Sequence, residues 1–296
     1  MIAQENVLPI EGSGRVIGRG DRRIGSILAA EGRLDSNDIE RVMALQHSEG
    51  LRFGDAALRL GMINVDDLNR AIAKQYDLPH LLPGNDSISN ELVIAQDPFN
   101  PRAEEFRGLR TQLLIRWSRA GVKHRVLAIV SPGSGEGRSY VAANLAVAFA
   151  QLGERTLLID ADLRKPRQHL IFNVSDRIGL SAVLSGRADR SAVAPVPEFG
   201  ALSLLPAGAR PPNPQELLTG LGLGVLLHEL RTDFDVILLD TAPAQPYADA
   251  QAVAFRAGSA LVVARKDSTR LADTKSVIRE LSDMGAHIVG TVFNAC

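Results

Sequence analysis

Cysteine, lysine and long apolar runs are all scarce in this chain of 296 residues. Its single cysteine, Cys296, excludes an internal disulfide framework and favours a reducing compartment. No apolar run approaches the roughly 18 residues that a membrane-spanning helix needs, and residues 1–20 lack the basic start and apolar core of a secretory signal. We therefore expect a cytoplasmic protein that does not insert directly into a membrane and that begins with a disordered leader.

Neither sign of charge is in excess, because 33 basic residues face 34 acidic ones. Without a global field, nucleic acid is not an expected partner and any anion site must be local. Only 5 of the 33 basic residues are Lys, so Arg can stand where related chains have Lys. The hydrophobic share of 45% and the length are typical of a folded chain with two modules.

Residues 23–75 contain an internal repeat. Each copy starts with Arg, an apolar residue and Gly, at Arg23 and Arg52, and the offset between these two arginines holds at the later apolar positions. The spacing predicts a short helix, a glycine-marked turn and a second helix, capped by Asp35 in the first copy and Asn64 in the second. This pattern fits a small helical domain with solvated arginines. Alternatively, the two guanidinium groups face a ligand with two-fold character, since guanidinium pairs with phosphate and stacks on purines.

The paired motif resembles the N-terminal MshEN domain of type II secretion and pilus ATPases, whose tandem motifs bind cyclic di-GMP. The resemblance covers residues 23–75 and implies that cyclic di-GMP is a ligand of this module. Docking of a protein partner is the alternative for a domain of this shape. Carried over by position, the residues implied to line the ligand are Arg23, Gly25, Leu28, Gly32, Arg52, Gly54, Leu58 and Gly61.

A proline-rich segment separates the repeat from the rest of the chain. Residues 79–101 contain four prolines and a Gly-Asn-Asp turn, which break any periodicity and predict an inter-domain boundary. We therefore expect a helical domain over residues 21–80, a linker over residues 81–100 and a larger domain over residues 101–296.

The larger domain is expected to open with a helix that Asn100 caps and Pro101 begins. An apolar stripe on this helix faces a core, while three charged residues, Glu104, Arg107 and Arg110, step along another face. Such a row is most often simply solvated, although it also leaves a face for ionic contacts.

A phosphate cradle is predicted next. Residues 126–130 form a short apolar run typical of a buried strand, and they lead into the glycine-rich loop SPGSGEGRSY at residues 131–140 and then a helix. A strand, a glycine-rich loop and a helix N-terminus together direct backbone N–H groups and a helix dipole at an anion.

Two further strands are expected to deliver carboxylates beside this loop. Residues 156–160 end in Asp160, followed by Asp162, and residues 236–240 end in Asp240. Ligands bind at the C-terminal ends of strands in open α/β sheets, and Mg²⁺ beside phosphate oxygens takes few protein carboxylates. The predicted fold is α/β: a doubly wound, mostly parallel sheet of the P-loop NTPase kind, preceded by a small all-helical domain.

These three segments resemble the Walker A, A′ and B motifs of the bacterial tyrosine kinases that govern exopolysaccharide chain length. The resemblance extends over residues 101–294 and includes LPAGARPPNPQELL at residues 205–218. With the repeat in front, the chain resembles the EpsG type of chain-length determinant tyrosine kinase. This implies an Mg·ATP-dependent protein tyrosine kinase acting in exopolysaccharide polymerisation and export, docked at the inner membrane to a membrane-bound chain-length (Wzz-like) partner.

The resemblance also implies roles for single residues. The nucleotide is implied to contact the loop and the end of the last strand, where the Asn294 amide would meet the adenine edge. The residues implied to contact it are Gly135, Glu136, Gly137, Arg138, Ser139, Tyr140 and Asn294. The catalytic positions are Arg138, Asp160 and Asp162, and the Mg²⁺ positions are Ser139, Asp162 and Asp240. The residues matching a motif that joins neighbouring subunits into a homo-oligomeric ring are Glu104, Arg107 and Arg110.

The sequence departs from the family pattern in two ways. Arg138 stands where the family usually has Lys, and a forked guanidinium is not equivalent to a compact ammonium. The sequence also lacks a tyrosine-rich tail before Cys296, so an acceptor on another protein is expected. Two alternatives stay open: a catalytically weak nucleotide-binding scaffold, and a positioning ATPase of the ParA/MinD type. The latter is disfavoured by Gly133 at the position of that group's signature lysine.

Overall fold

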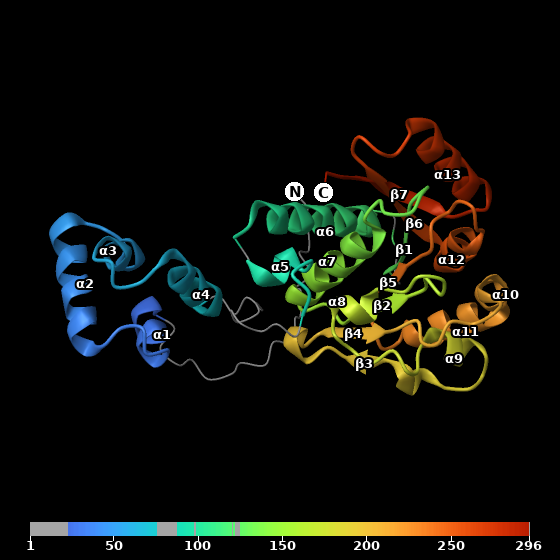
Figure 1. Ribbon diagram of the computed structural model, residues 1–296. Helices are drawn as coiled ribbons and strands as arrows, with labels where there is room; N and C mark the ends of the chain where they lie inside the picture. Colours follow the sequence, from blue (N-terminus) through green and yellow to red (C-terminus); the bar gives the residue numbers. More distant parts are fainter. Residues whose placement is uncertain (1–22, 76–87, 98, 120, 122–124, 296) are drawn as a thin grey trace, which may run out of the picture. The chain divides into compact units, whose positions relative to one another are not determined.

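The computed structural model describes residues 23–75, 88–97, 99–119, 121 and 125–295 (Figure 1). The chain divides into two compact units, Met1–Asp77 and Leu78–Cys296, and each is described by itself. The expected leader over residues 1–20 lies outside the described residues.

The first unit repeats one helix pair. Its helices are α1 (Ile24–Ala30), α2 (Ser36–Glu49), α3 (Phe53–Arg59) and α4 (Val65–Gln75). The start of α3 follows the start of α1 by the same offset that separates the starts of α4 and α2, and this offset equals that between Arg23 and Arg52. The predicted repeat and its helix–turn–helix form are therefore confirmed.

The same hydrogen-bonded cap opens the second helix of each copy. In the first copy the N–H of Asp38 donates to Asp35 Oδ1 at 2.8 Å, and the N–H of Asp35 donates back to Asp38. In the second copy the N–H of Asp67 donates to Asn64 Oδ1 at 2.8 Å, with the same reciprocal bond. These reciprocal bonds satisfy N–H groups that a helix start leaves without partners. Both predicted N-caps are confirmed.

The second unit is built on a seven-stranded sheet with the order β3-β4-β2-β5-β1-β6-β7. Only the β3–β4 pair is antiparallel. The strands are β1 (Arg125–Val130), β2 (Thr156–Asp160), β3 (Ala194–Pro195), β4 (Leu202–Leu205), β5 (Val236–Asp240), β6 (Ser259–Arg265) and β7 (His287–Asn294).

Helices cover both faces of the sheet (Figure 1). Alternate residues of each strand enter opposite cores: Leu127 and Ile129 of β1 face α6 and α7, while Val126 and Ala128 face α11 and α12. The helices are α5 (Val93–Gln96), α6 (Pro101–Arg119), α7 (Arg138–Gln151), α8 (Gln168–Ile171), α9 (Leu180–Leu184), α10 (Pro214–Thr219), α11 (Leu221–Leu230), α12 (Asp249–Ala257), α13 (Leu271–Asp283), and the 3₁₀ turns Arg190–Ala192 and Pro197–Phe199. The predicted fold class is confirmed.

The linker prediction was wrong at its C-terminal end. Leu92 and Ile94 are fully buried in the core between α6 and α7. Asn144 of α7 also holds this segment, accepting from the N–H of Ile94 at 3.3 Å and donating to the carbonyl of Glu91 at 2.8 Å. The prolines suggested a break in periodicity, but a single apolar turn between them is enough to anchor the chain.

Across the part of the chain that the structure describes, no helix combines the length and the apolar character needed to cross a membrane.

Candidate functional site

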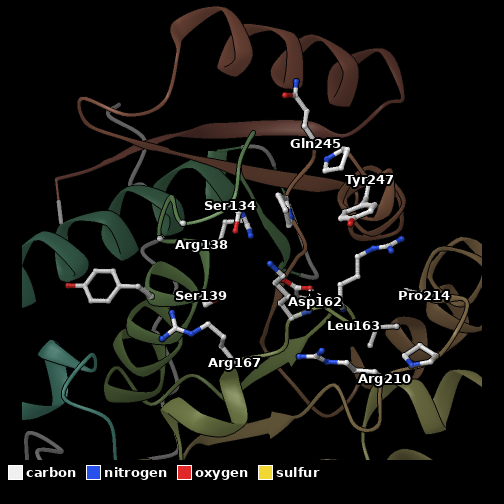
Figure 2. Close-up of a pocket in the computed structure, with 18 of the residues that line it drawn as sticks. Ser134, Arg138, Ser139, Asp162, Leu163, Arg167, Arg210, Pro214, Gln245 and Tyr247 are labelled. Atoms are coloured by element: carbon white, nitrogen blue, oxygen red, sulfur yellow. Dashed lines mark hydrogen bonds between the residues drawn. The ribbon is translucent and has the colours of Figure 1, made fainter.

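Three adjacent strands bring the three sequence motifs to one edge of the sheet. β5 lies between β1 and β2, and its last residue, Asp240, is paired in register with Ile129 of β1 and Asp160 of β2. Because the strands are parallel, the loop after β1 and both carboxylates emerge on the same side. Figure 2 shows Arg138, Ser139 and Asp162 around the resulting pocket.

The glycine-rich loop is held in place by hydrogen bonds to its own Glu136 and from Asn294 of the last strand. Glu136 accepts from the N–H of Gly133 at 2.8 Å and from the hydroxyl of Thr269 at 2.6 Å. Asn294 at the end of β7 donates to the carbonyl of Glu136 at 3.1 Å. Gly137 has φ +95°, and a Cβ there would lie 2.0 Å from the Asn294 amide. Only glycine therefore fits between the loop and β7.

Arg138 points into the loop rather than away from it. Its side chain is 7% exposed. Nε donates to the carbonyl of Thr241 at 2.9 Å, and Nη1 donates to the Ser131 hydroxyl and to the Gly133 carbonyl. The sequence predicted a cation directed at phosphates. Arg138 lines the pocket, and its guanidinium also fastens the loop to Thr241 at the end of β5.

Two buried carboxyls, Asp160 and Asp240, stand side by side behind the pocket. Burial raises the pKa of both groups, and the neighbouring Asp240 carboxyl raises the pKa of Asp160 further, well above its usual value. The charge of Arg138 and hydrogen bonds from Ser139 and Gln168 offset part of the rise in the pKa of Asp240. This is a carboxylate pair under electrostatic strain, as functional sites often contain.

Asp160 and Asp162, predicted together as catalytic, play different parts in the structure. Asp160 is fully buried and accepts from the backbone N–H groups of Asp162, Arg167 and Gln168 at 3.2, 3.0 and 2.9 Å. Asp162 lines the pocket, and its Oδ1 accepts from the N–H of Lys165 at 2.8 Å. Asp160 therefore holds the loop that presents Asp162.

The pocket has a volume of about 650 Å³ and a basic, proline-walled outer part. Ser139, Asp162 and Arg210 are among the residues that line it (Figure 2). Arg164 lines it too, but Asp249 binds this guanidinium at 2.6 and 3.0 Å and the Tyr247 ring lies 3.7 Å away. Sequence reasoning missed Tyr247 and Asp249, because neither lies in a recognisable motif.

The residues present fit a magnesium ion bound together with phosphate. Among the described residues, no group of three His, Cys, Asp or Glu side chains could hold a metal unaided. Asp240 keeps one oxygen, Oδ1, buried with no hydrogen-bond partner in the structure, and the Ser139 hydroxyl lies near enough to this carboxyl to lower its pKa. Because Mg²⁺ uses one or two carboxylates and otherwise phosphates and waters, this donor set suits it.

A second pocket of about 540 Å³ lies on the other side of the loop. Tyr140 lines both pockets, and Asn294 and Phe293 from β7 close the second one against α6. The Tyr140 ring meets Phe106 of α6 edge-on, with centroids 5.6 Å apart. Two pockets therefore meet at Tyr140, one beside the phosphate loop and one between α6 and β7.

The charged row on α6 is only partly exposed. Glu104 pairs with Arg107 and keeps 68% of its side chain exposed. Arg110 instead donates to the carbonyl of Ala148 on α7 at 2.8 Å, and burial, together with the neighbouring Arg107, lowers its pKa. The predicted interface row therefore has one arginine that already binds within its own unit.

In the helical unit, the eight residues predicted to line a ligand are not all together. Arg23 and Gly25 line a pocket of about 380 Å³ with Gln46, Phe53 and others. The remaining six lie elsewhere. Leu28 is buried in the core, Gly32 and Gly61 follow helices with positive φ, and Gly54 packs on Leu68. Leu58 is partly buried, and Arg52 is the residue before α3.

Comparison with known proteins places this site in a family. The model of the CobQ/CobB/MinD/ParA nucleotide binding domain matches residues 127–295. CapB of Staphylococcus aureus, which carries a tyrosine-protein kinase name, is 32% identical over 208 residues, covering 70% of this chain and 90% of CapB. The chain belongs to the bacterial tyrosine-kinase family. EpsB of Ralstonia solanacearum, named likewise, is 34% identical over 204 residues, which are 69% of this chain but only 27% of EpsB.

Solved structures agree with the fold of the larger unit. The chimeric protein CapA2B2 is 31% identical, with a TM-score of 0.65 over 76% of this chain and 98% of that chain. The septum site-determining protein MinD from Pyrococcus horikoshii, solved with Mg-ADP, is 29% identical, with a TM-score of 0.50 over 57% of this chain and 69% of that chain. Membership of the tyrosine-kinase family supports a kinase or ATPase role with ATP and Mg²⁺ for the larger unit.

Proposed function

We propose that this chain is an Mg·ATP-dependent protein tyrosine kinase that regulates exopolysaccharide polymerisation, chain length and export. The observation that carries the proposal is the meeting of three motifs on neighbouring strands, where the loop after β1 and the carboxyls of Asp160 and Asp240 emerge at one edge of the sheet. Relatives with tyrosine-protein kinase names share this part of the chain.

The nucleotide would lie across the loop. Its phosphate oxygens would accept hydrogen bonds from the backbone N–H groups between Gly135 and Ser139. These groups lie at the N-terminus of α7, where the helix dipole favours negative charge. The adenine would enter the second pocket, between Tyr140 and Asn294. Ser139 and Asp240 would hold Mg²⁺, directly or through water, and the ion would neutralise charge on the phosphates.

The acceptor tyrosine would enter through the outer part of the first pocket. Asp162 is the carboxylate that lines this space, so it would orient the tyrosine hydroxyl or accept its proton. Asp160 would act through its three backbone hydrogen bonds, which fix the loop that carries Asp162. Arg164, locked by Asp249, would shape the wall without being free to follow the substrate.

A chain with Asp162→Asn, produced in cells that lack the wild-type gene, tests the kinase proposal against the scaffold alternative. We expect phosphotyrosine on the export machinery to fall to background and polymer length to change with it, because Asp162 is the only carboxylate among the described residues that line the pocket. Immunoblotting and gel analysis of the polymer give both readings, with Asp176→Asn as a control outside the pocket. Unchanged polymer without phosphotyrosine would favour the scaffold.

The scaffold alternative is favoured by one observation, the inward position of Arg138. A guanidinium held by Thr241, Ser131 and Gly133 stabilises the loop but contributes less to charge developing on a transferred phosphoryl group. Under the scaffold alternative, ATP binding drives assembly of the chain and ATP turnover is slow.

Assembly and partner remain proposals of the same kind. Glu104 is the exposed member of the α6 row, so it is the residue placed to reach an arginine of a neighbouring copy in a ring. A membrane-bound chain-length protein of the Wzz type would recruit this chain to the inner membrane.

We also propose that the helical unit binds cyclic di-GMP at the pocket lined by Arg23 and Gly25. A Cβ at Gly25 would lie 3.0 Å from the Phe53 ring, so glycine keeps the backbone open beside an aromatic surface. An arginine and an aromatic ring suit a phosphate joined to a purine.

Calorimetry on the full chain tests this ligand. Wild type should bind cyclic di-GMP, and Arg23→Ala should weaken binding at least about tenfold, as expected for the loss of one charge-assisted contact worth about 1.5–3 kcal/mol. Arg59→Ala serves as the matched control, because Arg59 pairs with Glu49 away from the pocket. Absence of heat with wild type, or equal affinity in Arg23→Ala, contradicts the assignment.

A further inference from the structure

Gln168, the first residue of α8, connects all three motifs of the nucleotide site. It is fully buried. Its backbone N–H donates to Asp160 Oδ2 at 2.9 Å, and its side-chain Nε2 donates to Asp240 Oδ2 at 2.8 Å and to the carbonyl of Ser139 at 3.1 Å. No sequence motif marks this residue, because a single Gln after a Pro-Arg pair has no characteristic spacing.

The orientation of the Gln168 amide follows from its neighbours. The Asp240 carboxyl and the Ser139 carbonyl both present acceptors, so the NH₂ group must face them and the carbonyl oxygen must face away. Gln168 Oε1 is accordingly buried without a hydrogen-bond partner in the structure, and so is Asp240 Oδ1. Two buried acceptors next to the same contact thus lack donors, and a buried acceptor without a donor is destabilising.

A magnesium ion held beside Ser139 would give the Asp240 carboxylate the partner that it lacks in the structure. No lysine, arginine or hydroxyl of the described residues is bonded to either oxygen. The loop serine that would hold the ion, Ser139, is the residue whose carbonyl Gln168 already binds.

We propose that Gln168 is a positioning residue for magnesium: its Nε2 fixes the Asp240 carboxyl against the phosphate loop and so orients the carboxylate that would hold the ion. The proposal rests on the Mg·ATP function above and adds a residue to it. In this proposal Gln168 determines how strongly nucleotide binding depends on Mg²⁺, whereas the loop backbone determines the affinity for the nucleotide without the metal. Loss of the amide should therefore separate the two.

The test uses the full chain and a fluorescent ADP analogue, titrated in EDTA and over a range of Mg²⁺ concentrations. Gln168→Met, similar in length but unable to donate, should raise the Mg²⁺ concentration for half-maximal effect at least about tenfold, while the affinity in EDTA stays within about twofold. Gln168→Asn, which keeps an amide but is one methylene shorter, should show a smaller shift in the same direction. Gln151→Met is the control, because Gln151 donates to the carbonyl of Ile94 away from the site.

A double-mutant cycle with Asp240→Asn makes the test specific. If Gln168 acts through Asp240 and the metal, Gln168→Met should add nothing to Asp240→Asn. A purely structural role would instead lower nucleotide affinity equally with and without Mg²⁺, and that result overturns the proposal, as does wild-type behaviour of both Gln168 variants. If wild type binds nucleotide without any effect of Mg²⁺, the proposed function fails as well, so the two failures are distinguishable.

Discussion

Asp240→Asn is expected to stabilise the larger unit and to abolish its turnover. The side chain is fully buried beside Asp160, and burial raises the pKa of both carboxyls. Asn keeps an oxygen that can accept from Gln168 and Ser139 but removes one buried charge from the pair. We expect a gain on the order of 1–3 kcal/mol at neutral pH in EDTA, which is a Tm increase of roughly 2–4 °C per kcal/mol for a unit of this size.

The stability gain should depend on pH in a defined direction. A carboxyl whose pKa is raised in the folded state binds more protons folded than unfolded, so wild-type stability falls as pH rises from the ordinary Asp value through the raised one. The advantage of Asn is therefore largest at neutral pH and shrinks as pH falls toward 4. Thermal unfolding of both proteins in EDTA across this range measures it.

Turnover should move the other way. Without the Asp240 carboxylate, the site loses one of the two groups proposed to hold Mg²⁺, and we expect ATP hydrolysis to fall at least about 100-fold. Leu239→Val, a conservative change at the preceding residue of β5, controls for packing. A variant that is both less stable and equally active would show that the carboxyl pair is neither strained nor used.

Arg138→Ala is expected to be among the most destabilising single changes in the larger unit. It leaves the Thr241 and Gly133 carbonyls without the cation that binds them, and it removes the positive charge that offsets Asp240. Losing one partner of a buried charged network costs about 3–5 kcal/mol. The melting temperature should fall by about 10 °C or more, and nucleotide binding should fall with it.

Arg138→Lys separates the structural part of this residue from the chemical part. An ammonium is compact and cannot hold all three acceptors with a planar fork, so we expect a loss of about 1–2 kcal/mol in stability. The same ammonium is free to reach phosphate oxygens, so turnover should rise about tenfold. Differential scanning fluorimetry and phosphate release measure the two effects. A stable Arg138→Ala would contradict the structural role of Arg138 in holding the loop, and a slower Arg138→Lys would contradict its effect on turnover.

Much of the fold followed from local patterns. Apolar runs ending in Asp, such as residues 156–160, predicted buried parallel strands because only a sheet covered on both faces accepts such runs. The internal repeat predicted both helix pairs, since Asp35 and Asn64 are strong caps at equivalent positions. These signals depend on neighbouring residues in the sequence, and the tertiary packing in the structure agrees with the secondary structure that they predict.

The orientation of side chains within the site could not be predicted in the same way. Asp160 and Asp162 follow one strand, and only the path of the loop decides that Asp160 turns inward to three backbone N–H groups while Asp162 lines the pocket. Arg138 could equally have faced outward. Gln168 lies 72 residues from Asp240 in the sequence, so their contact depends on the completed sheet.

Phosphotyrosine formation by the purified chain tests the central claim most directly. The chain is incubated with Mg·ATP and a tyrosine-containing cytoplasmic segment of the proposed membrane-bound partner, and transfer is quantified by mass spectrometry, beside Arg138→Lys and Asp162→Asn. We predict slow Mg²⁺-dependent transfer by wild type, faster transfer by Arg138→Lys and none by Asp162→Asn. Nucleotide binding without transfer in wild type and in Arg138→Lys would contradict the kinase proposal and leave a nucleotide-dependent scaffold.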